Sequence, residues 1–237
     1  MTAGAGPLAL VGSGEFLPAM LETDATLLAG RPPRVAVLAT AAAPDGDAVV
    51  RRWYDLAGRH YATLDAEVVE VDVRDRADAG RADLAALVAG AGLVYLSGGK
   101  PDHLVAALRG TPVADAVVAA WRGGAALAGC SAGAMALAAG WPSFVRAGGG
   151  LQAGLGVVPG LAVVPHFDRF VSWRRRWVDR VGAERPAGVR VVGIDEDTAL
   201  VWDPAGGWRV TGVGGVHELA GGPPVPLGDT PDLPVPA

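Results

Sequence analysis

The segment Gly129-Cys130-Ser131-Ala132-Gly133 has the residue types and spacing that most clearly suggest chemistry. An apolar run at 125–128 enters this G-x-S-x-G pentapeptide, and a run of small and apolar residues at 134–139 leaves it. The pattern predicts a buried strand, a sharp turn and a helix, which is the setting of a nucleophilic serine. Small neighbours allow a strained turn at a helix N-terminus, where developing negative charge is stabilised. The alternative is that Ser131 only caps the helix.

A serine hydroxyl needs a neighbouring base, and that base needs a carboxylate to orient it. His166 directly follows a predicted strand ending at Val164, and the acidic residues at 195–197 follow another strand at 190–194. The order Ser, His, acid differs from the Ser, acid, His order of α/β-hydrolases, so a plain α/β-hydrolase is disfavoured. The alternative interpretations are a turn or buried histidine and a solvated acidic turn.

Glycines follow two other predicted strands. Gly98 and Gly99 come just after residues 93–96, where backbone amides can face a ligand at the end of a parallel strand. The loop at 12–15 has two glycines without a third at dinucleotide-binding spacing, so it is a poor nucleotide motif. We therefore expect no cofactor.

These loops must be held by an alternating series of strands and helices. The alternation from residue 8 to about 139 predicts an α/β fold with a mostly parallel sheet covered by helices on both faces. The pattern predicts strands at 8–11, 34–39, 67–73 and 93–96 and helices at 47–62, 75–89, 104–108 and 113–121. Polar and apolar residues alternate at 67–73, which places that strand near an edge.

The C-terminal part predicts extra β-hairpins. A glycine-rich stretch at 148–156 predicts a hairpin or a mobile loop beside the site, and residues 170–181 predict a helix. Further strands are expected at 199–202, 208–213 and 216–219. We expect one domain over residues 1–220 and an extended or disordered proline-rich tail at 221–237.

Composition excludes several classes of function. Of 237 residues, 51% are hydrophobic and 19% are charged, which is typical of a well-buried globular fold. The formal net charge of −5 gives no attraction to nucleic acid or anionic membranes, and no apolar run is long enough to cross a bilayer. A cytoplasmic protein is therefore expected, and a homodimer is left open. A single cysteine and four scattered histidines argue against a disulfide or a metal site.

Four motifs in the same order resemble the serine peptidase family of dipeptidase E and cyanophycinase, in the class I glutamine amidotransferase-like superfamily. They are Gly98-Gly99, the segment 129–134, Pro165-His166-Phe167 and the segment 193–199, and the resemblance spans residues 8–219. It implies that Ser131 is the nucleophile, His166 the general base and acid, and Glu196 the orienting carboxylate. The resemblance also implies an oxyanion hole from the Gly99 and Ala132 amides.

Other carboxylates compete for the third position. Asp168 ranks second, because His166-x-Asp168 imitates the His-x-Glu of amidotransferases, and Asp195 ranks third. Cys130 is not the central residue of the pentapeptide, so it is interpreted as a packed thiol.

The segments expected to line the substrate pocket differ from the family pattern. Lys100-Pro101 and Val164-Pro165 stand where cyanophycinase has Asp-Gln in each place. Gly98, Lys100 and Arg169 are candidate substrate-binding residues, and the arginines at 174–176 are further cations.

The leading hypothesis is a serine peptidase that cleaves short peptides or isopeptides, including bonds beside an aspartate, through an acyl-enzyme. Its partner would be a small peptide substrate. The alternatives are a non-catalytic member of the superfamily that binds a ligand or a protein partner, and an esterase or acyl transferase with the same triad.

Overall fold

Two β-sheets form the framework of the protein in a computed structural model that describes residues 4–143, 150–169 and 175–237. The first sheet contains β1 Leu8–Val11, β2 Arg34–Leu38, β3 Glu67–Glu70, β4 Leu93–Leu96, β5 Ala126–Cys130, β10 Thr198–Asp203 and β11 Gly207–Gly212. Its strand order is β11-β10-β1-β5-β4-β2-β3. The strands from β1 to β3 in this order are parallel to one another, whereas β10 and β11 are antiparallel to their neighbours. The predicted edge strand, β3, lies at the edge.

The second sheet is built mostly from the C-terminal part of the chain. Its strands are β6 Ala138–Pro142, β7 Leu151–Ala153, β8 Val158–Val164, β9 Arg190–Ile194, β12 Val216–Glu218 and β13 Val225–Pro226. They follow the order β13-β12-β9-β8-β6-β7, with β6, β8 and β9 parallel. The sequence pattern predicts β8, β9 and β12 as strands and a hairpin or a loop at β7, but it does not show that these strands form a separate sheet.

Helices cover both faces of the first sheet, as the alternation of strand and helix predicts. Side chains of successive strand residues point to opposite faces. Accordingly, Ala9 and Val11 pack in a core with α1 Leu21–Leu28 and α2 Asp47–Ala62. Leu8 and Leu10 pack in another core with α3 Arg76–Ala79, α4 Ala82–Ala86, α5 Pro101–Leu108, α6 Pro112–Arg122 and α7 Ala132–Leu137. The mostly parallel α/β fold class is therefore confirmed.

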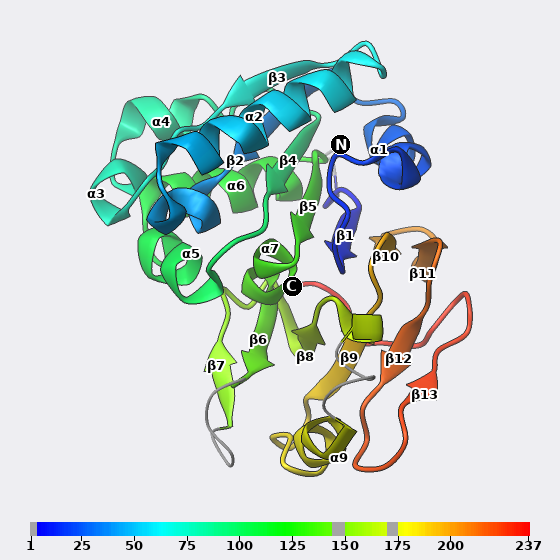
Figure 1. The fold of residues 1–237 in the computed structure, drawn as a ribbon. Coiled ribbons are helices and arrows are strands. Elements are labelled where there is room, and N and C mark those ends of the chain that lie inside the picture. Colours follow the sequence, from blue (N-terminus) through cyan, green and yellow to red (C-terminus); the bar gives the residue numbers. More distant parts are fainter. Residues whose placement is uncertain (1–3, 144–149, 170–174) are drawn as a thin grey trace.

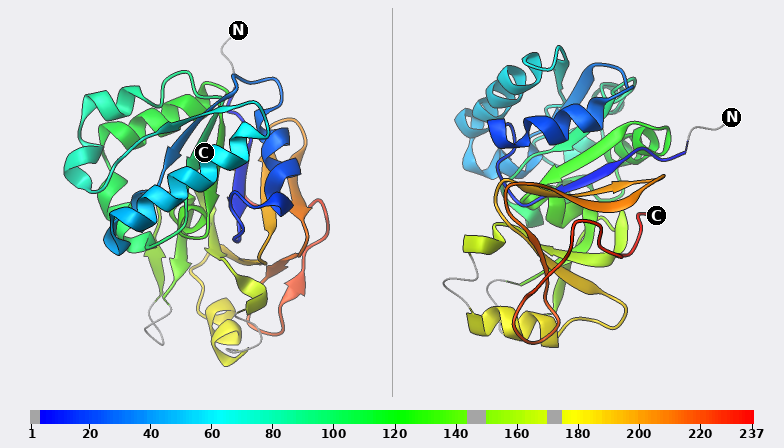
Figure 2. Two further views of the ribbon diagram at one scale, coloured as in Figure 1. Left: turned by 45° about the horizontal axis from the view of Figure 1, so that its top comes forward. Right: turned by 90° about the vertical axis from the view of Figure 1, so that its right-hand side faces the viewer.

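The helix α7 lies between the two sheets. It begins directly after β5 and packs against β1 and β4 of the first sheet and against β6 and β8 of the second (Figure 1). The other face of the second sheet packs on α9 Arg175–Ala183, and Figure 2 shows α2 and α9 at opposite ends of the molecule in its right-hand view. The N-terminus of α7 therefore lies where the sheets meet.

Three segments differ from the sequence-based expectation. The helix expected to run to residue 139 ends at Leu137, because Ala138 begins strand β6, which pairs with β7 and β8. The helix expected at 75–89 is divided into α3 and α4, and α1 was not predicted. Residues 148, 149 and 170–174, part of the predicted hairpin and helix, lie outside the described residues.

The proline-rich segment 221–237 is mostly extended and packs on the rest of the chain. Its Leu233 is only 5% exposed, and the indole N–H of Trp208 donates to the Pro234 carbonyl at 3.0 Å. The Ala237 N–H donates to the Val157 carbonyl at 2.9 Å. No single helix in the described part of the chain is long and apolar enough to cross a membrane; α5 and α6 pass that test only as a pair bent by 93°.

Candidate active site

Ser131 occupies a strained turn between β5 and α7. Its backbone angles are φ 50° and ψ −106°, a conformation that costs energy for a residue with a side chain. The flanking glycines make the turn possible. A Cβ on Gly133 would lie 2.1 Å from the Leu96 carbonyl oxygen, and one on Gly129 would lie 2.5 Å from the Gly133 carbonyl carbon. The G-x-S-x-G pattern is therefore a steric requirement of this turn.

His166 brings an imidazole from the second sheet to this serine. It directly follows Pro165 at the end of β8 and also has a positive φ, of 50°. Its backbone N–H donates to the Gly12 carbonyl at 3.3 Å, which ties the end of β8 to the end of β1. The imidazole Nε2 lies 3.2 Å from the Ser131 Oγ.

Glu196 binds the opposite side of the same imidazole. Its Oε1 lies 2.7 Å from the Nδ1 of His166, and its Oε2 accepts a hydrogen bond from the Nε of Arg169 at 3.0 Å. A carboxylate only accepts hydrogen bonds, so it favours the tautomer with the proton on Nδ1. That tautomer leaves Nε2 free to accept the proton of the serine hydroxyl, which is the arrangement of a nucleophile, a base and an orienting acid.

The two competing aspartates have other partners. Asp168 accepts a hydrogen bond from the backbone N–H of Glu196 at 3.0 Å. Asp195 binds the N–H of Gly215 at 2.9 Å, and its Oδ2 lies 3.1 Å from the Nε2 of His217. Among the described residues, Glu196 is thus the carboxylate that meets His166.

Near the serine, the backbone N–H groups of Gly99 and Ala132 are among those without a hydrogen-bond partner within the described residues. Ala132 is the first residue of α7, where the N–H groups of a helix lack partners within the helix. Gly99 has φ +144°, and a Cβ there would lie 2.3 Å from the Ala41 carbonyl oxygen, so the position requires glycine. Both groups are available to a negatively charged oxygen.

Gly98, a candidate substrate-binding residue, has its backbone N–H engaged within the protein. Its N–H donates to the Oε1 of Glu15 at 2.9 Å. Glu15 was not predicted as a site residue. Its position in the polar loop after β1 was an available signal, because ligand sites in α/β proteins lie at the carboxyl ends of the strands.

The predicted cations lie at the surface. The Nζ of Lys100 lies 3.6 Å from the Oδ1 of Asp45, and the Lys100 side chain is 59% exposed. The Arg169 side chain is 74% exposed and pairs with Glu196. Arg174 and the side chains of the arginines at 175 and 176 lie outside what the structure describes.

Cys130 is a packed thiol at the end of β5. The residue is fully buried, and its Sγ lies 2.7 Å from the Oε2 of Glu15. Burial, and next the negative charge of Glu15, raise the pKa of the Cys130 thiol well above its ordinary value. The thiol therefore stays protonated and donates to Glu15.

No group of three or more His, Cys, Asp or Glu side chains within the described residues is placed to hold a metal ion.

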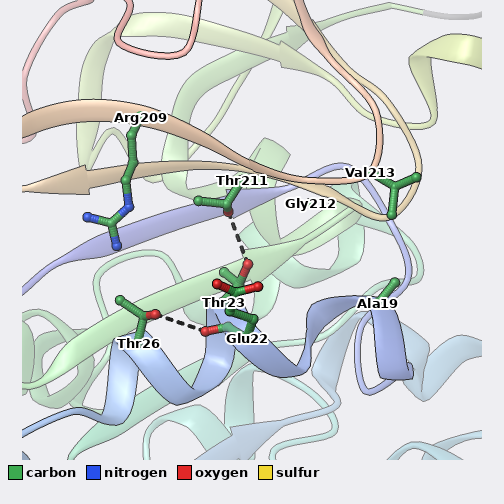
Figure 3. A pocket seen from close by; sticks show the side chains of 8 residues that line it. All are labelled: Ala19, Glu22, Thr23, Thr26, Arg209, Thr211, Gly212 and Val213. Atoms are coloured by element: carbon green, nitrogen blue, oxygen red, sulfur yellow. Dashed lines mark hydrogen bonds between the residues drawn. The ribbon is translucent and has the colours of Figure 1, made fainter.

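A pocket of about 540 Å³ lies between α1 and β11. Figure 3 shows Arg209 and Thr211 on one side of this pocket and Glu22 and Thr26 on the other. None of the predicted site residues lines it.

Comparison with known proteins supports a peptidase. The family model described as peptidase family S51 matches residues 9–206. The crystal structure of a peptidase from an acI-B1 Actinobacterium is 33% identical, with a TM-score of 0.87, and the match covers 100% of this chain and 99% of that one.

A more distant structure shares the fold. The 1.5 Å crystal structure of a putative peptidase E protein from Listeria monocytogenes EGD-e is 14% identical, with a TM-score of 0.61 and coverage of 89% of this chain and 100% of that one. No curated protein matches. The family match extends over most of the chain, from β1 to the turn between β10 and β11, and includes every residue of the Ser131, His166 and Glu196 site; the chain belongs to peptidase family S51.

Proposed function

We propose that this protein hydrolyses short peptides or isopeptides through an acyl-enzyme formed on Ser131. The observation that carries the proposal is the continuous hydrogen-bonded series from Ser131 through His166 to Glu196, with distances of 3.2 and 2.7 Å. An unassisted serine hydroxyl is a weak nucleophile, and a base held in the correct tautomer overcomes this weakness.

In the proposed reaction, the Ser131 Oγ attacks the carbonyl carbon of the scissile bond while its proton passes to Nε2 of His166. The imidazolium that forms is stabilised by Glu196 through the Nδ1 proton. The N–H groups of Gly99 and Ala132 bind the oxyanion of the tetrahedral intermediate. Transfer of the Nε2 proton to the leaving amine breaks the C–N bond and leaves an ester on Ser131. A water molecule, deprotonated by His166, then hydrolyses that ester.

Lys100 and Arg169 support a preference for substrates with an acidic group. Both are cations with substantial exposure close to the proposed oxyanion site: Lys100 follows Gly99 in the chain, and Arg169 binds the triad carboxylate through its Nε. The planar guanidinium of an arginine suits the geometry of a substrate carboxylate, and the ammonium of a lysine can bind it as a point charge.

The test combines a serine-reactive fluorophosphonate probe with a panel of dipeptides and β-aspartyl isopeptides. The wild-type protein should be labelled and should hydrolyse at least one member, and Ser131→Ala should lose both properties. Thr26→Ala, which removes a hydroxyl from α1, serves as a matched control and should retain both. Hydrolysis that persists at the wild-type rate in Ser131→Ala would refute the proposal.

The same experiment separates the alternatives. A binding protein without activity would remain unlabelled while still binding a member of the panel. An esterase or acyl transferase would be labelled at Ser131 but would turn over an ester or transfer an acyl group without hydrolysing the peptides.

A further inference from the structure

Glu15 is a buried carboxylate directly behind the proposed oxyanion site. The residue is only 6% exposed, and it follows β1 in the loop that begins at Gly12. Both of its oxygens are used: Oε1 accepts from the Gly98 N–H at 2.9 Å, and Oε2 accepts from the Cys130 thiol at 2.7 Å. Burying a carboxylate is unfavourable unless it is hydrogen-bonded, so its placement here needs an explanation.

The loop at residues 97–100 shows what the carboxylate holds. The N–H of Ser97 donates to the Leu38 carbonyl at 3.1 Å, and that of Lys100 donates to the Ala41 carbonyl at 2.7 Å. The N–H of Gly98 donates to Glu15. Three of these four consecutive amides are therefore bound, and the Gly99 N–H is the one left without a partner within the described residues.

Gly98 lies between Glu15 and the serine. A Cβ on Gly98 would lie 2.8 Å from the Oε1 of Glu15 and 3.4 Å from the Cβ of Ser131. Two adjacent glycines give a backbone with unusual rotational freedom, so the direction of the Gly99 N–H is not fixed by local sterics alone. A hydrogen bond to a carboxylate, stronger than one to a neutral acceptor, restricts the preceding peptide plane.

We propose that Glu15 is a positioning residue that holds the Gly98-Gly99 backbone so that the Gly99 N–H faces the oxyanion. This inference rests on the proposed function, because it assigns a role within that reaction. Donors in an oxyanion hole work by being fixed in place before charge develops. The Glu15 side chain supplies this fixation from the end of β1, the strand next to β5 in the first sheet.

Cys130 completes the arrangement. Its thiol donates to the oxygen of Glu15 that Gly98 does not use, and the raised pKa of the thiol keeps that proton in place. In this role the buried thiol beside the serine serves as a hydrogen-bond donor to Glu15 and not as a nucleophile.

The decisive variant is Glu15→Gln. A glutamine amide presents one acceptor oxygen and one NH2 donor, and the sulfur of Cys130 is only a weak acceptor, so glutamine cannot hold both Gly98 and Cys130 as the carboxylate does. We expect kcat to fall by about tenfold to a hundredfold, less than the effect of deleting an oxyanion donor, with KM changed less than about threefold. The affinity for a peptide aldehyde, whose hemiacetal oxygen occupies the oxyanion site, should fall by a similar factor. The affinity for the product peptide should not change.

A rescue variant makes the test specific. In Glu15→Gln combined with Cys130→Ser, the serine hydroxyl can accept from the glutamine NH2, which leaves the glutamine oxygen for Gly98. The double variant should therefore recover part of the aldehyde affinity. Glu15→Asp, which shortens the carboxylate by one methylene, should show the same selective loss and replaces Glu15→Gln if circular dichroism shows that variant to be unfolded.

The matched control is Asp24→Asn. Asp24 is also a buried carboxylate, only 2% exposed, but its Oδ2 lies 2.8 Å from the Nε2 of His60, whereas Gly98 and Cys130 both bind Glu15. This control should keep the wild-type ratio of aldehyde to product affinity. A folded Glu15→Gln variant with wild-type kcat and aldehyde affinity, or with equal losses for aldehyde and product, would overturn the inference alone. A wild-type protein that neither hydrolyses peptides nor reacts with the fluorophosphonate probe would overturn the proposed function as well.

Discussion

Ser131 and His166 come from different sheets, yet the serine Oγ lies 3.2 Å from the imidazole Nε2. The serine follows β5 of the first sheet, and the histidine follows β8 of the second. A hydrogen bond from the His166 N–H to the Gly12 carbonyl joins the end of β8 to the end of β1, the strand beside β5. The site therefore depends on how the two sheets pack against each other. Substitutions of the site residues test the chemistry, and substitutions of core residues test the packing.

The partner of His166 can be tested with two neighbouring carboxylates. Glu196→Gln should lower kcat/KM for a peptide substrate by about 10² to 10⁴, because the neutral amide no longer stabilises the imidazolium or its correct tautomer. Asp168→Asn should cost less than about tenfold, since the partner of Asp168 within the described residues is the backbone N–H of Glu196 and not His166. Steady-state kinetics of the two variants decide the matter. A larger loss in Asp168→Asn would assign the triad acid to Asp168.

The turn at the serine can be tested with a pair of glycines. Gly133→Ala should lower the free energy of unfolding by at least about 2 kcal/mol, because the new Cβ would lie 2.1 Å from the Leu96 carbonyl oxygen. Gly58, in the interior of α2, has open space at its Cβ position, so Gly58→Ala should stabilise by roughly 0.5–1 kcal/mol. Urea unfolding measures both values. Equal effects of the two substitutions would contradict the steric account.

The C-terminal segment contains a comparable pair. Leu233 is 5% exposed and belongs to the core that contains residues of both sheets, so Leu233→Ala should destabilise the protein by about 2–3 kcal/mol. Val235 is 61% exposed, and Val235→Ala should change stability by less than about 0.5 kcal/mol. Thermal unfolding followed by circular dichroism should separate the two variants. Equal stability of Leu233→Ala and Val235→Ala would contradict the burial of Leu233 against the rest of the chain.

Stability should fall at alkaline pH. Burial raises the pKa of Tyr61 and Tyr95, and burial followed by Glu15 raises that of Cys130. The folded protein thus retains protons that the unfolded chain releases above about pH 8.5 for cysteine and about pH 10 for tyrosine. The unfolded state then binds fewer protons, so the free energy of unfolding decreases as pH rises through that range.

Urea unfolding between about pH 7 and pH 11 measures this dependence. Cys130→Ser lacks the thiol, so its stability should begin to fall only near the tyrosine range. A free energy of unfolding that increases above about pH 9 would have the wrong sign and would contradict the prediction.

The two cations near the site should affect substrates with an acidic group. Lys100→Ala and Arg169→Ala should each raise KM for an aspartate-containing dipeptide by about fivefold relative to its asparagine counterpart, because an exposed ion pair contributes up to about 1 kcal/mol. Arg169→Ala should also lower kcat for both substrates, since it removes a donor to Glu196. Arg209→Ala, in the pocket between α1 and β11, is the control and should change neither value. Equal KM changes for both dipeptides would exclude recognition of the acidic group by these residues.

Local patterns in the sequence were sufficient to predict the elements whose structure depends on residues close together in the chain. The strand β1 lies where the short apolar run predicts it, and the helix α2 has the expected ends. The turn at Ser131 was predictable because it requires glycine at positions 129 and 133, where a Cβ would collide with backbone within the turn or in the adjoining strand. The membership in a peptidase family agrees with the resemblance of four short motifs.

Only the tertiary structure decided which distant residues meet. The sequence offered Asp168, Asp195 and Glu196 within reach of His166, and the loop joining β9 to β10 turns Glu196 toward the imidazole while Asp195 faces His217. The role of Glu15 was hidden for the same reason, because it lies 83 residues from Gly98 and 115 from Cys130. Periodicity records which face of an element is buried, whereas the register between two sheets depends on long-range packing that no local pattern contains.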